Sequence, residues 1–415
     1  MDQPKLSLAI IARDREIEIE RGLASVSPHV DEIVVVDTGS RDKTVEVARK
    51  FGAKILFYTP ETNPEGFFLD APETFERHNL PGPWSGKMAL GNFSIPRNMS
   101  FEACTGDYIM WIDTDDVVVG AENIRKIVNI MATEDIKIGM FRYDYDHDAE
   151  GNVVITQVRE RIIKNKSGIS WINPIHEHLS GFRKGMLFED VYVKHDRKVV
   201  AVSKERVDIG NGVMARVVHA DPNICYRNVK TMLHHMDEME KCDKPVQAKF
   251  YYLLGSEMRN IDEKKAEKIM DAFIEKGDHP EDVSHAHMQI AHLYEVKGKW
   301  DIALDRYKKS LAVFNRNPAA LLGIARCLFA QGDAAGCIKA TETGFKIYDS
   351  GTVHSFLQPM ERKYRALGPY AAALTEVGQW KKALEVCDEG LALVPNCPQL
   401  GSLKEYTRSH IAEAA

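Results

Sequence analysis

Three aspartates stand close together directly after an apolar run, in the stretch GDYIMWIDTDDVVV of residues 106–119. Clustered carboxylates repel one another, so a partner has to offset their proximity. Asp113 and Asp115, two residues apart on an extended turn, can both face a hard divalent cation, which prefers oxygen ligands and neutralises that repulsion. The alternative is a solvated turn in which Asp116 caps a following helix. The sequence therefore offers a candidate metal site at Asp113 and Asp115, with helix capping as the expected role of Asp116.

Strand-like and helix-like stretches alternate around these aspartates. Four short apolar runs predict buried strands, and they are LSLAIIA, EIVVVD, KILFY and YIMWID. The stretches REIEIERGLASVSPHV and RDKTVEVARKFGA between them are typical of helices, and residues 117–131 are expected to form another. This order predicts a parallel α/β sheet, and such sheets place their ligands at the carboxyl ends of the strands. The aspartates follow one of those ends.

The alternation fails in residues 59–93, which we call the 59–93 segment. Six prolines and four glycines lie between residues 60 and 96. They argue against a continuous sheet element there, because proline and glycine interrupt regular secondary structure. Five aromatic residues in the same stretch argue against simple disorder, and they are Phe67, Phe68, Phe75, Trp84 and Phe93. A structured lid or substrate loop is the favoured interpretation.

The second half of the chain is helical and repeats itself. Residues 295–318 and 375–398 superimpose at a constant offset, with Gly298 on Gly378 and Trp300 on Trp380. Gly332 marks a weaker middle copy, and a degenerate unit is expected from about Tyr251. A helix-turn-helix period with small residues at tight crossings is the tetratricopeptide signature. We therefore predict a first domain of residues 1–221 and a second of residues 222–415, made of a helical linker and the repeats, with an inserted loop at residues 348–359.

Composition restricts the class of protein. The formal net charge of -7 disfavours a generic nucleic-acid-binding surface. The seven cysteines are spread out without a CxxC pair, which indicates free thiols in a reducing compartment. No apolar run is long enough for a membrane span, and the first residues lack the layout of a signal peptide. A cytoplasmic location is expected, in the host cytoplasm if a phage encodes the chain.

Four stretches in order resemble family 2 glycosyltransferases, which have the GT-A fold. They are LAIIARDREIEIERGLASV, IVVVDTGSRDKT, SIPRNMSFEACTGDYIMW and IDTDD. The resemblance extends to members with tetratricopeptide-like tails, such as lipopolysaccharide-core glucosyltransferase-like enzymes, sublancin-type S-glycosyltransferases and phage-encoded relatives. It implies an α/β GT-A domain, with a Rossmann-like, mostly parallel mixed sheet, followed by an all-α repeat domain. It also implies a metal-dependent, inverting transfer from a nucleotide-diphosphate sugar, with UDP favoured over GDP or dTDP.

The resemblance assigns donor-side roles by position. Asp115 would hold Mn²⁺ or Mg²⁺, Asp113 would be shared between the metal and the donor, and His195 would complete the metal site. Arg97 resembles a phosphate-contacting arginine, for which a guanidinium is well suited. Asp37 resembles the residue that binds the uracil ring. Ala12 and Asp14 are expected to line the base pocket, although Asp14 is equally suited to a helix N-cap.

The acceptor side is expected in residues 159–197. Glu177 resembles the general base of some subgroups, and Asp190 is the alternative. His176 and Trp171 are candidate acceptor contacts, although Trp171 also suits a buried core position.

The acceptor itself stays open. A repeat groove favours a protein or peptide hydroxyl or thiol. Hydroxymethylated phage DNA or a surface glycan is the alternative, and the basic residues at 159, 161, 164, 166, 183 and 184 are the sequence support for DNA. The repeats could also form a homodimer interface. A non-enzymatic scaffold is the competing class of function, and the presence of every expected site residue argues against it.

Overall fold

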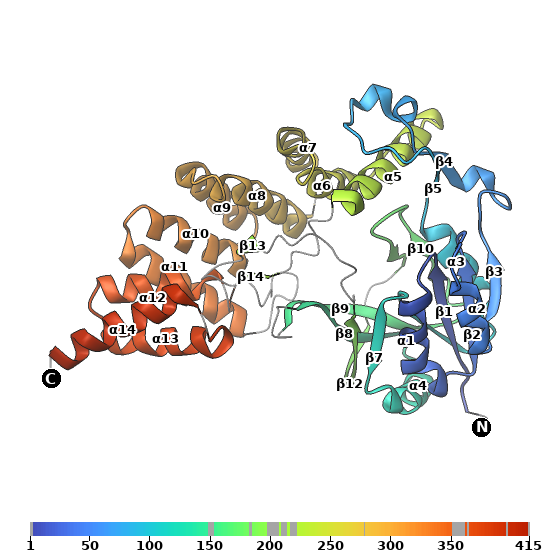
Figure 1. The fold of residues 1–415 in the computed structure, drawn as a ribbon, viewed down its shortest axis with the longest axis horizontal. Coiled ribbons are helices and arrows are strands. Elements are labelled where there is room, and N and C mark those ends of the chain that lie inside the picture. Colours follow the sequence, from blue (N-terminus) through green and yellow to red (C-terminus); the bar gives the residue numbers. More distant parts are fainter. Residues whose placement is uncertain are drawn as a thin grey trace. The chain divides into compact units, whose positions relative to one another are not determined.

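The computed structural model describes residues 3–147, 153–181, 185–196, 207–208, 214–215, 222–277, 279–350, 362, 365–395 and 397–413. These residues fall into two compact units, drawn from 1–145, 157–202 and 226–246 in the first and from 146–156, 203–225 and 247–415 in the second. The predicted class, an α/β domain followed by an all-α repeat domain, is confirmed by the elements of the two units (Figure 1).

An eight-stranded mixed sheet forms the centre of the first unit, in the order β3-β2-β1-β6-β9-β8-β12-β7. Its strands are β1 (Leu6–Ala12), β2 (Glu32–Asp37), β3 (Lys54–Phe57), β6 (Tyr108–Trp111), β7 (Asp116–Val119), β8 (Ile138–His147), β9 (Val153–Lys164) and β12 (Met186–His195). The first four strands of the order are parallel, whereas β9 is antiparallel to β6 and β7 is antiparallel to β12. The carboxyl ends of β1, β2 and β6 therefore share one edge.

Helices cover both faces of this sheet. Apolar side chains of α1 (Glu16–Val26), α2 (Thr44–Lys50) and α4 (Ile124–Thr133) pack in one cluster with alternate residues of β1. On the other face, α3 (Ser94–Glu102) packs with Ala9, Val34 and Trp171, the last from the small sheet of β10 (Trp171–Ile172) and β11 (His178–Leu179). Burial on both faces explains why the central strands are continuous apolar runs.

The helix predicted over residues 117–131 is wrong in its first part. Val117–Val119 belong to β7, which pairs with β12 through Val118 and Val193, and α4 begins only at Ile124. A short apolar run cannot distinguish strand from helix by periodicity alone. The pairing partner lies more than 70 residues further along the chain, and the local sequence does not show it.

The 59–93 segment is folded, as predicted. It contains a hairpin of β4 (Phe67–Leu69) and β5 (Met88–Leu90), with short 3-10 turns at Pro64–Gly66 and Pro72–His78. Outside this segment, the first unit has two other short 3-10 turns, at Ser27–His29 and Ala121–Asn123. Phe75 packs against both Phe68 and Trp84 inside the segment, with ring centroids 5.6 Å apart in each of the two pairs. These contacts account for the aromatic content that argued against disorder.

The helix α5 (Pro222–Lys241) packs against this segment from residue 226 onward. His234 lies 4.8 Å from Phe68 between ring centroids, and His78 binds Asp237 at 2.8 Å. The sequence division at residue 222 assigned this helix to the second domain, as a linker before the repeats, whereas residues 226–246 lie with the first unit. A two-residue pair of β13 (Val207–Asp208) and β14 (Met214–Ala215) belongs to the second unit.

The second unit is built from helix pairs (Figure 1). They are α6 (Ala248–Met258) with α7 (Glu263–Lys276), α8 (Pro280–Glu295) with α9 (Trp300–Val313), α10 (Pro318–Ala330) with α11 (Ala334–Asp349), and α12 (Leu367–Glu376) with α13 (Trp380–Leu393), followed by α14 (Pro398–Glu413). The repeat glycines Gly298, Gly332 and Gly378 occupy equivalent turns, each with a positive φ of 66° to 82°. The predicted repeat array is confirmed, whereas residues 351–359 of the predicted inserted loop lie outside the described residues.

All seven cysteines are free thiols, and six of them are buried while Cys242 is exposed. None of the helices in the described part of the chain combines the length and apolar character that crossing a bilayer requires.

Candidate active site

The three aspartates after β6 face three different partners. Asp113 accepts a hydrogen bond from Arg97 at 2.7 Å, and Asp116 accepts one from Arg161 at 2.9 Å. Asp115 lies 3.7 Å from the imidazole of His195. The repulsion expected from the sequence is therefore offset by Arg97 at Asp113 and by Arg161 at Asp116. Asp115 remains close to His195, and together they could bind a metal ion.

Asp116 is the most deeply placed of the three, and the helix cap predicted for it is wrong. Its side chain and that of Arg161 are both fully buried. Its carboxylate also accepts from the backbone N–H of Asp113 at 3.0 Å, which ties the turn together. Arg161 comes from β9 and lies between the rings of Trp111 and Tyr143, with centroid distances of 4.0 and 4.5 Å. Asp116, the last residue of the DTDD stretch, therefore has a structural role in the site, because it binds both Arg161 and the backbone of the turn.

His195 closes the cluster at the end of β12, where the sequence expected it. Its Nδ1 lies 3.2 Å from Asp116 and 2.9 Å from the hydroxyl of Tyr143, and Tyr145 stacks on its ring at 5.1 Å. Burial, followed by the charges of Asp116 and Asp113, raises the pKa of Tyr143, so its hydroxyl stays protonated.

The donor set at this place fits a hard divalent cation. One ligand atom from each of Asp115, Asp116 and His195 lies within 4.8 Å of the others. Carboxylate oxygens with an imidazole suit Mn²⁺ and Mg²⁺ chemistry. His195 Nε2 is buried and finds no hydrogen-bond partner among the described residues. Asp113, which the sequence placed in the metal set, instead pairs with Arg97 in this structure.

Arg97 bridges two carboxylates that lie far apart in the sequence. Its Nη2 contacts Asp113 at 2.7 Å and its Nε contacts Glu177 at 2.9 Å. Its guanidinium carbon lies 5.2 and 5.0 Å from the ring centroids of Trp111 and Trp171. Burial would raise the pKa of Asp113, but the charges of Arg97 and Arg161 outweigh burial and hold that pKa well below its usual range. Asp113 is therefore ionised across the working pH range.

The segment before Glu177 explains how this carboxylate reaches the bridge. Asn98 of α3 binds the backbone of Trp171 twice, at 2.7 and 2.9 Å. The turn between β10 and β11 then carries Glu177 to Arg97, which lies one residue before Asn98. Glu177 and Arg97 are mostly buried, with side-chain exposures of 10% and 13%.

Three other sequence candidates take no part in the Asp113–Arg97–Glu177 bridge. Asp190 is exposed on β12 and faces Lys126 at 3.4 Å. Trp171 is only 2% exposed and packs on Trp111 and Phe101, which confirms its core position. His176 is exposed, with a positive φ of 52°.

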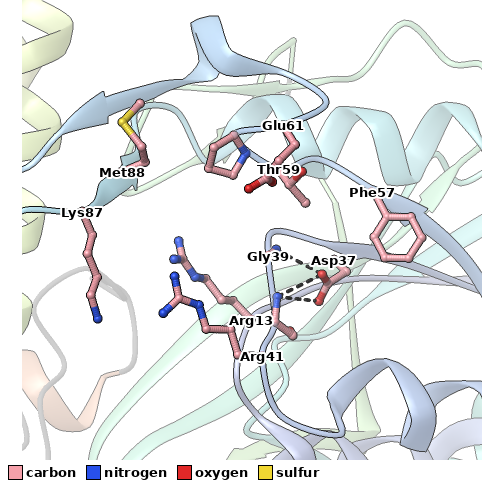
Figure 2. Close-up of a pocket in the computed structure, with 11 residues that line it drawn as sticks. Arg13, Asp37, Gly39, Arg41, Phe57, Thr59, Glu61, Lys87 and Met88 are labelled. Atoms are coloured by element: carbon pink, nitrogen blue, oxygen red, sulfur yellow. Dashed lines mark hydrogen bonds between the residues drawn. The ribbon is translucent and has the colours of Figure 1, made fainter.

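A pocket of about 490 Å³ lies at the ends of β1 and β2, and we call it the Asp37 pocket. Its lining consists of Arg13, Asp37, Gly39, Ser40, Arg41, Phe57, Thr59, Pro60, Glu61, Lys87 and Met88. The buried carboxylate of Asp37 accepts from the backbone N–H groups of Gly39 and Ser40, each at 3.0 Å (Figure 2). Arg13 and Arg41 extend into the pocket from one side and Lys87 from the other.

Ala12 and Asp14 frame this pocket without lining it. The carbonyl of Ala12 accepts from the backbone N–H of Thr38 at 2.9 Å, which joins the ends of β1 and β2. Asp14 accepts from the N–H of Arg41 at 2.7 Å, and its own N–H donates to Ser40. Asp14 therefore links two loops, and Arg15 occupies the N-cap position of α1.

Sequence reasoning missed Asp116, Arg161 and the cations Arg13, Arg41 and Lys87 as site residues. The fourth acid of the DTDD stretch was a visible signal for Asp116. Arg161 gave only a weak signal, as one charge next to the apolar pair Ile162 and Ile163.

Comparison with known proteins finds glycosyltransferases and a repeat protein. The chain is 34% identical to glucosyl-3-phosphoglycerate synthase of Petrotoga mobilis over 119 residues, which is 27% of this chain and 30% of that protein. It is 30% identical to an uncharacterized glycosyltransferase of Rickettsia typhi over 112 residues, covering 27% and 28%. It is 28% identical to a TPR repeat-containing protein of Synechococcus elongatus over 173 residues, covering 42% and 35%.

These similarities are partial. The chain spans about a third of the length of the curated relatives it matches. No family model matches the chain. Among solved structures, glucosyl-3-phosphoglycerate synthase from Mycobacterium tuberculosis, in complex with Mn²⁺, UDP and glucosyl-3-phosphoglycerate, is 24% identical with a TM-score of 0.23, covering 34% of this chain and 44% of that one.

Proposed function

We propose that the chain is a glycosyltransferase that moves a sugar from a nucleotide-diphosphate sugar to an acceptor, with a divalent metal ion held after β6. The proposal rests on one observation: a possible metal-ligand set and an arginine that bridges two carboxylates lie next to each other after β6. Ligand atoms of Asp115, Asp116 and His195 lie within 4.8 Å, next to the Asp113–Arg97–Glu177 bridge. Partial similarity to glycosyltransferases supports the same reaction.

The donor would occupy the edge formed by β1, β2 and β6. The Asp37 pocket is large enough for a nucleoside, since small-molecule sites span roughly 300–1,000 Å³. We assign the base to this pocket, with a UDP-sugar as the first candidate. Arg97 uses Nε and Nη2 for its two carboxylates, and we assign its Nη1 to a phosphate oxygen.

The metal site would be formed by Asp115 and His195, with Asp116 Oδ1 behind them. Bound Mn²⁺ or Mg²⁺ would supply Lewis-acid stabilisation of the departing diphosphate. Arg161 holds the other oxygen of Asp116, so this carboxylate keeps one orientation. Asp113, which begins the turn that contains Asp115 and Asp116, forms an ion pair with Arg97.

Glu177 is the residue that we assign as general base of an inverting transfer. It would accept the proton of the attacking hydroxyl or thiol, and its ion pair with Arg97 fixes its orientation. Asp190 is exposed on β12 and pairs with Lys126, and within the described part of the chain none of its contacts reaches Arg97 or Glu177. We therefore propose Glu177 in preference to Asp190.

The acceptor is proposed to be a protein or peptide, because the second unit is a repeat array of the kind that binds extended chains. Modified phage DNA and a surface glycan are the alternatives. The DNA alternative loses one of its basic residues, because Arg161 is fully buried on Asp116. Residues 183 and 184 lie outside the described residues.

Donor binding gives the first test. A thermal-shift screen of UDP, GDP and dTDP sugars with Mn²⁺ or Mg²⁺ should raise the melting temperature for one nucleotide, because a ligand that binds only the folded state stabilises it. The variant Asp115→Asn should lose the metal-dependent part of that shift and all transfer. A chain that no nucleotide stabilises in the presence of metal would refute the proposal.

A matched pair of variants tests the base. Glu177→Gln should lower the transfer rate at least about a hundredfold while donor binding is retained, because general-base catalysis contributes roughly 10²–10⁴ in rate. Asp190→Asn should keep near-wild-type transfer. The reverse pattern would assign the base to Asp190.

A further inference from the structure

The 59–93 segment contributes five residues to the lining of the Asp37 pocket, namely Thr59, Pro60 and Glu61 at its start and Lys87 and Met88 near its end. Lys87 directly precedes β5, whose first residue, Met88, pairs with Leu69 of β4. The segment is therefore a wall of the pocket as well as a folded insertion. Lys87 reaches into the pocket opposite Arg13 and Arg41 (Figure 2).

The position of Lys87 is set by Asp70. The backbone N–H of Asp70 donates to the carbonyl of Lys87, and the N–H of Gly86 donates to the carbonyl of Asp70, each at 2.9 Å. The Asp70 carboxylate also accepts from the N–H of Ser85 at 3.1 Å. Three consecutive residues of the turn are thus hydrogen-bonded to one aspartate.

Lys230 of α5 holds Asp70 in turn. Its ammonium contacts the Asp70 carboxylate at 2.6 Å, and the two side chains are only 6% and 12% exposed. The same ammonium donates to the carbonyl of Pro83 and lies 4.7 Å from the ring centroid of Trp84. Removing one partner of such a buried pair is strongly destabilising, because the charge of the other partner is left uncompensated.

The charges of the pocket call for an anionic ligand. Three cations (Arg13, Arg41 and Lys87) line it, against two carboxylates, Asp37 and Glu61. The Asp37 carboxylate already accepts from two backbone N–H groups. A lysine ammonium is a compact point charge that suits a phosphate oxygen.

We propose that Lys87 is a donor-binding residue whose ammonium binds a phosphate oxygen of the nucleotide, and that the Asp70–Lys230 pair positions it. This inference rests on the proposed use of a nucleotide sugar. It gives the 59–93 segment a function in donor binding, with α5 as its support.

The test compares nucleotides that differ only in phosphate. Calorimetric titrations with UDP, UMP and uridine, at fixed Mn²⁺, are made on the full chain, on Lys87→Ala and on the control Lys50→Ala, an exposed lysine of α2 outside the pocket. Lys87→Ala should weaken UDP binding about tenfold or more, which is the size of one charge-assisted hydrogen bond. Uridine affinity and the control should stay within about twofold of wild type.

The outcomes separate this inference from the proposed function. If the wild-type chain binds UDP and Lys87→Ala binds it equally well, Lys87 does not contact the donor and the inference is wrong. If the wild-type chain binds none of the three ligands, the proposed function itself fails.

The positioning role of Lys230 has its own readout. Lys230→Met should weaken UDP binding by a factor similar to that of Lys87→Ala. The double variant should bind no more weakly than Lys87→Ala alone, since coupled residues are non-additive. Circular dichroism of each variant checks that it is folded. Multiplying effects in the double variant would show that Lys230 acts independently of Lys87 and would overturn the positioning role.

Discussion

Neighbouring acids in the DTDD stretch perform separate tasks because their partners come from different elements. Asp113 faces Arg97 of α3, Asp116 faces Arg161 of β9, and Asp115 points toward His195 of β12. A cation for each of two acids removes most of the repulsion. The third acid then remains close to a buried imidazole, which is the arrangement expected of a metal ligand.

The buried pair of Asp116 and Arg161 should dominate the stability of this site. Arg161→Met leaves a fully buried carboxylate without its cation, so we expect the free energy of unfolding of the first unit to fall by about 3–5 kcal/mol. The measurement is urea denaturation followed by tryptophan fluorescence.

A control lies three residues away on the same strand. Lys164 is 41% exposed and pairs with Asp135, which is 73% exposed, so Lys164→Met should cost less than about 1 kcal/mol. Equal losses in the two variants would contradict a special role for the buried pair.

The helix pairs of the second unit depend on small residues at their crossings. A Cβ atom added at Gly323 of α10 would lie 2.4 to 2.7 Å from ring atoms of Tyr307 in α9, whereas one at Gly401 of α14 would meet nothing within 4 Å. Gly323→Ala should therefore lower the free energy of unfolding by about 1–3 kcal/mol, as overpacked cores do. Gly401→Ala should raise it by up to about 1 kcal/mol through helix propensity.

Thermal or urea unfolding, followed by far-UV circular dichroism, compares these two helical glycines under one set of conditions. If Gly323→Ala were as stable as Gly401→Ala, α9 and α10 would not approach as closely as the structure shows.

Helix α8 carries a buried histidine that should make the repeats sensitive to acid. Burial lowers the pKa of His287 to about 4, and the charges of Arg306 and Lys309 on α9 add to the effect. The side chain is 7% exposed, and its Nδ1 is without a hydrogen-bond partner among the described residues. The neutral imidazole is therefore the form that the folded state accommodates.

The sign of the pH dependence follows from this lowered pKa. The unfolded chain takes up the proton near pH 6.5 and the folded chain only near pH 4, so stability declines as the pH falls across this window. The decline due to His287 should reach at most about 3 kcal/mol.

Urea unfolding at several pH values should show a flatter profile for His287→Gln than for wild type. The control His279→Gln, at a position 63% exposed, should follow the wild-type profile. A wild-type slope in His287→Gln would show that the imidazole is not held neutral.

The sequence correctly predicted those strands and turns that are determined by residues close together in the chain. Continuous apolar runs identified β1, β2, β3 and β6, and the recurring glycines identified the repeat turns. The strand β7 was missed because its pairing with β12 is a long-range contact. Arg161 was missed as a site residue for the same reason, since its partner Asp116 is 45 residues away.

At the scale of the whole chain, α5 changes where the first unit is taken to end. Contacts of Lys230, His234 and Asp237 attach this helix to the 59–93 segment. The sequence predicted residues 222–246 as part of a helical linker with little strand signal and therefore joined them to the second domain. Packing partners, rather than the type of secondary structure, decide the assignment.

The distribution of the thiols has a practical consequence for spectroscopy. Six of the seven cysteines are buried, and burial raises the pKa of Cys104 and of Cys327 to about 12, which suppresses the reactive thiolate. Cys242 is exposed and directly follows α5. A maleimide dye or spin label should therefore attach at this one position of the unaltered chain. A reporter there would follow the end of the helix that supports the pocket wall while nucleotide is added, without a single engineered substitution.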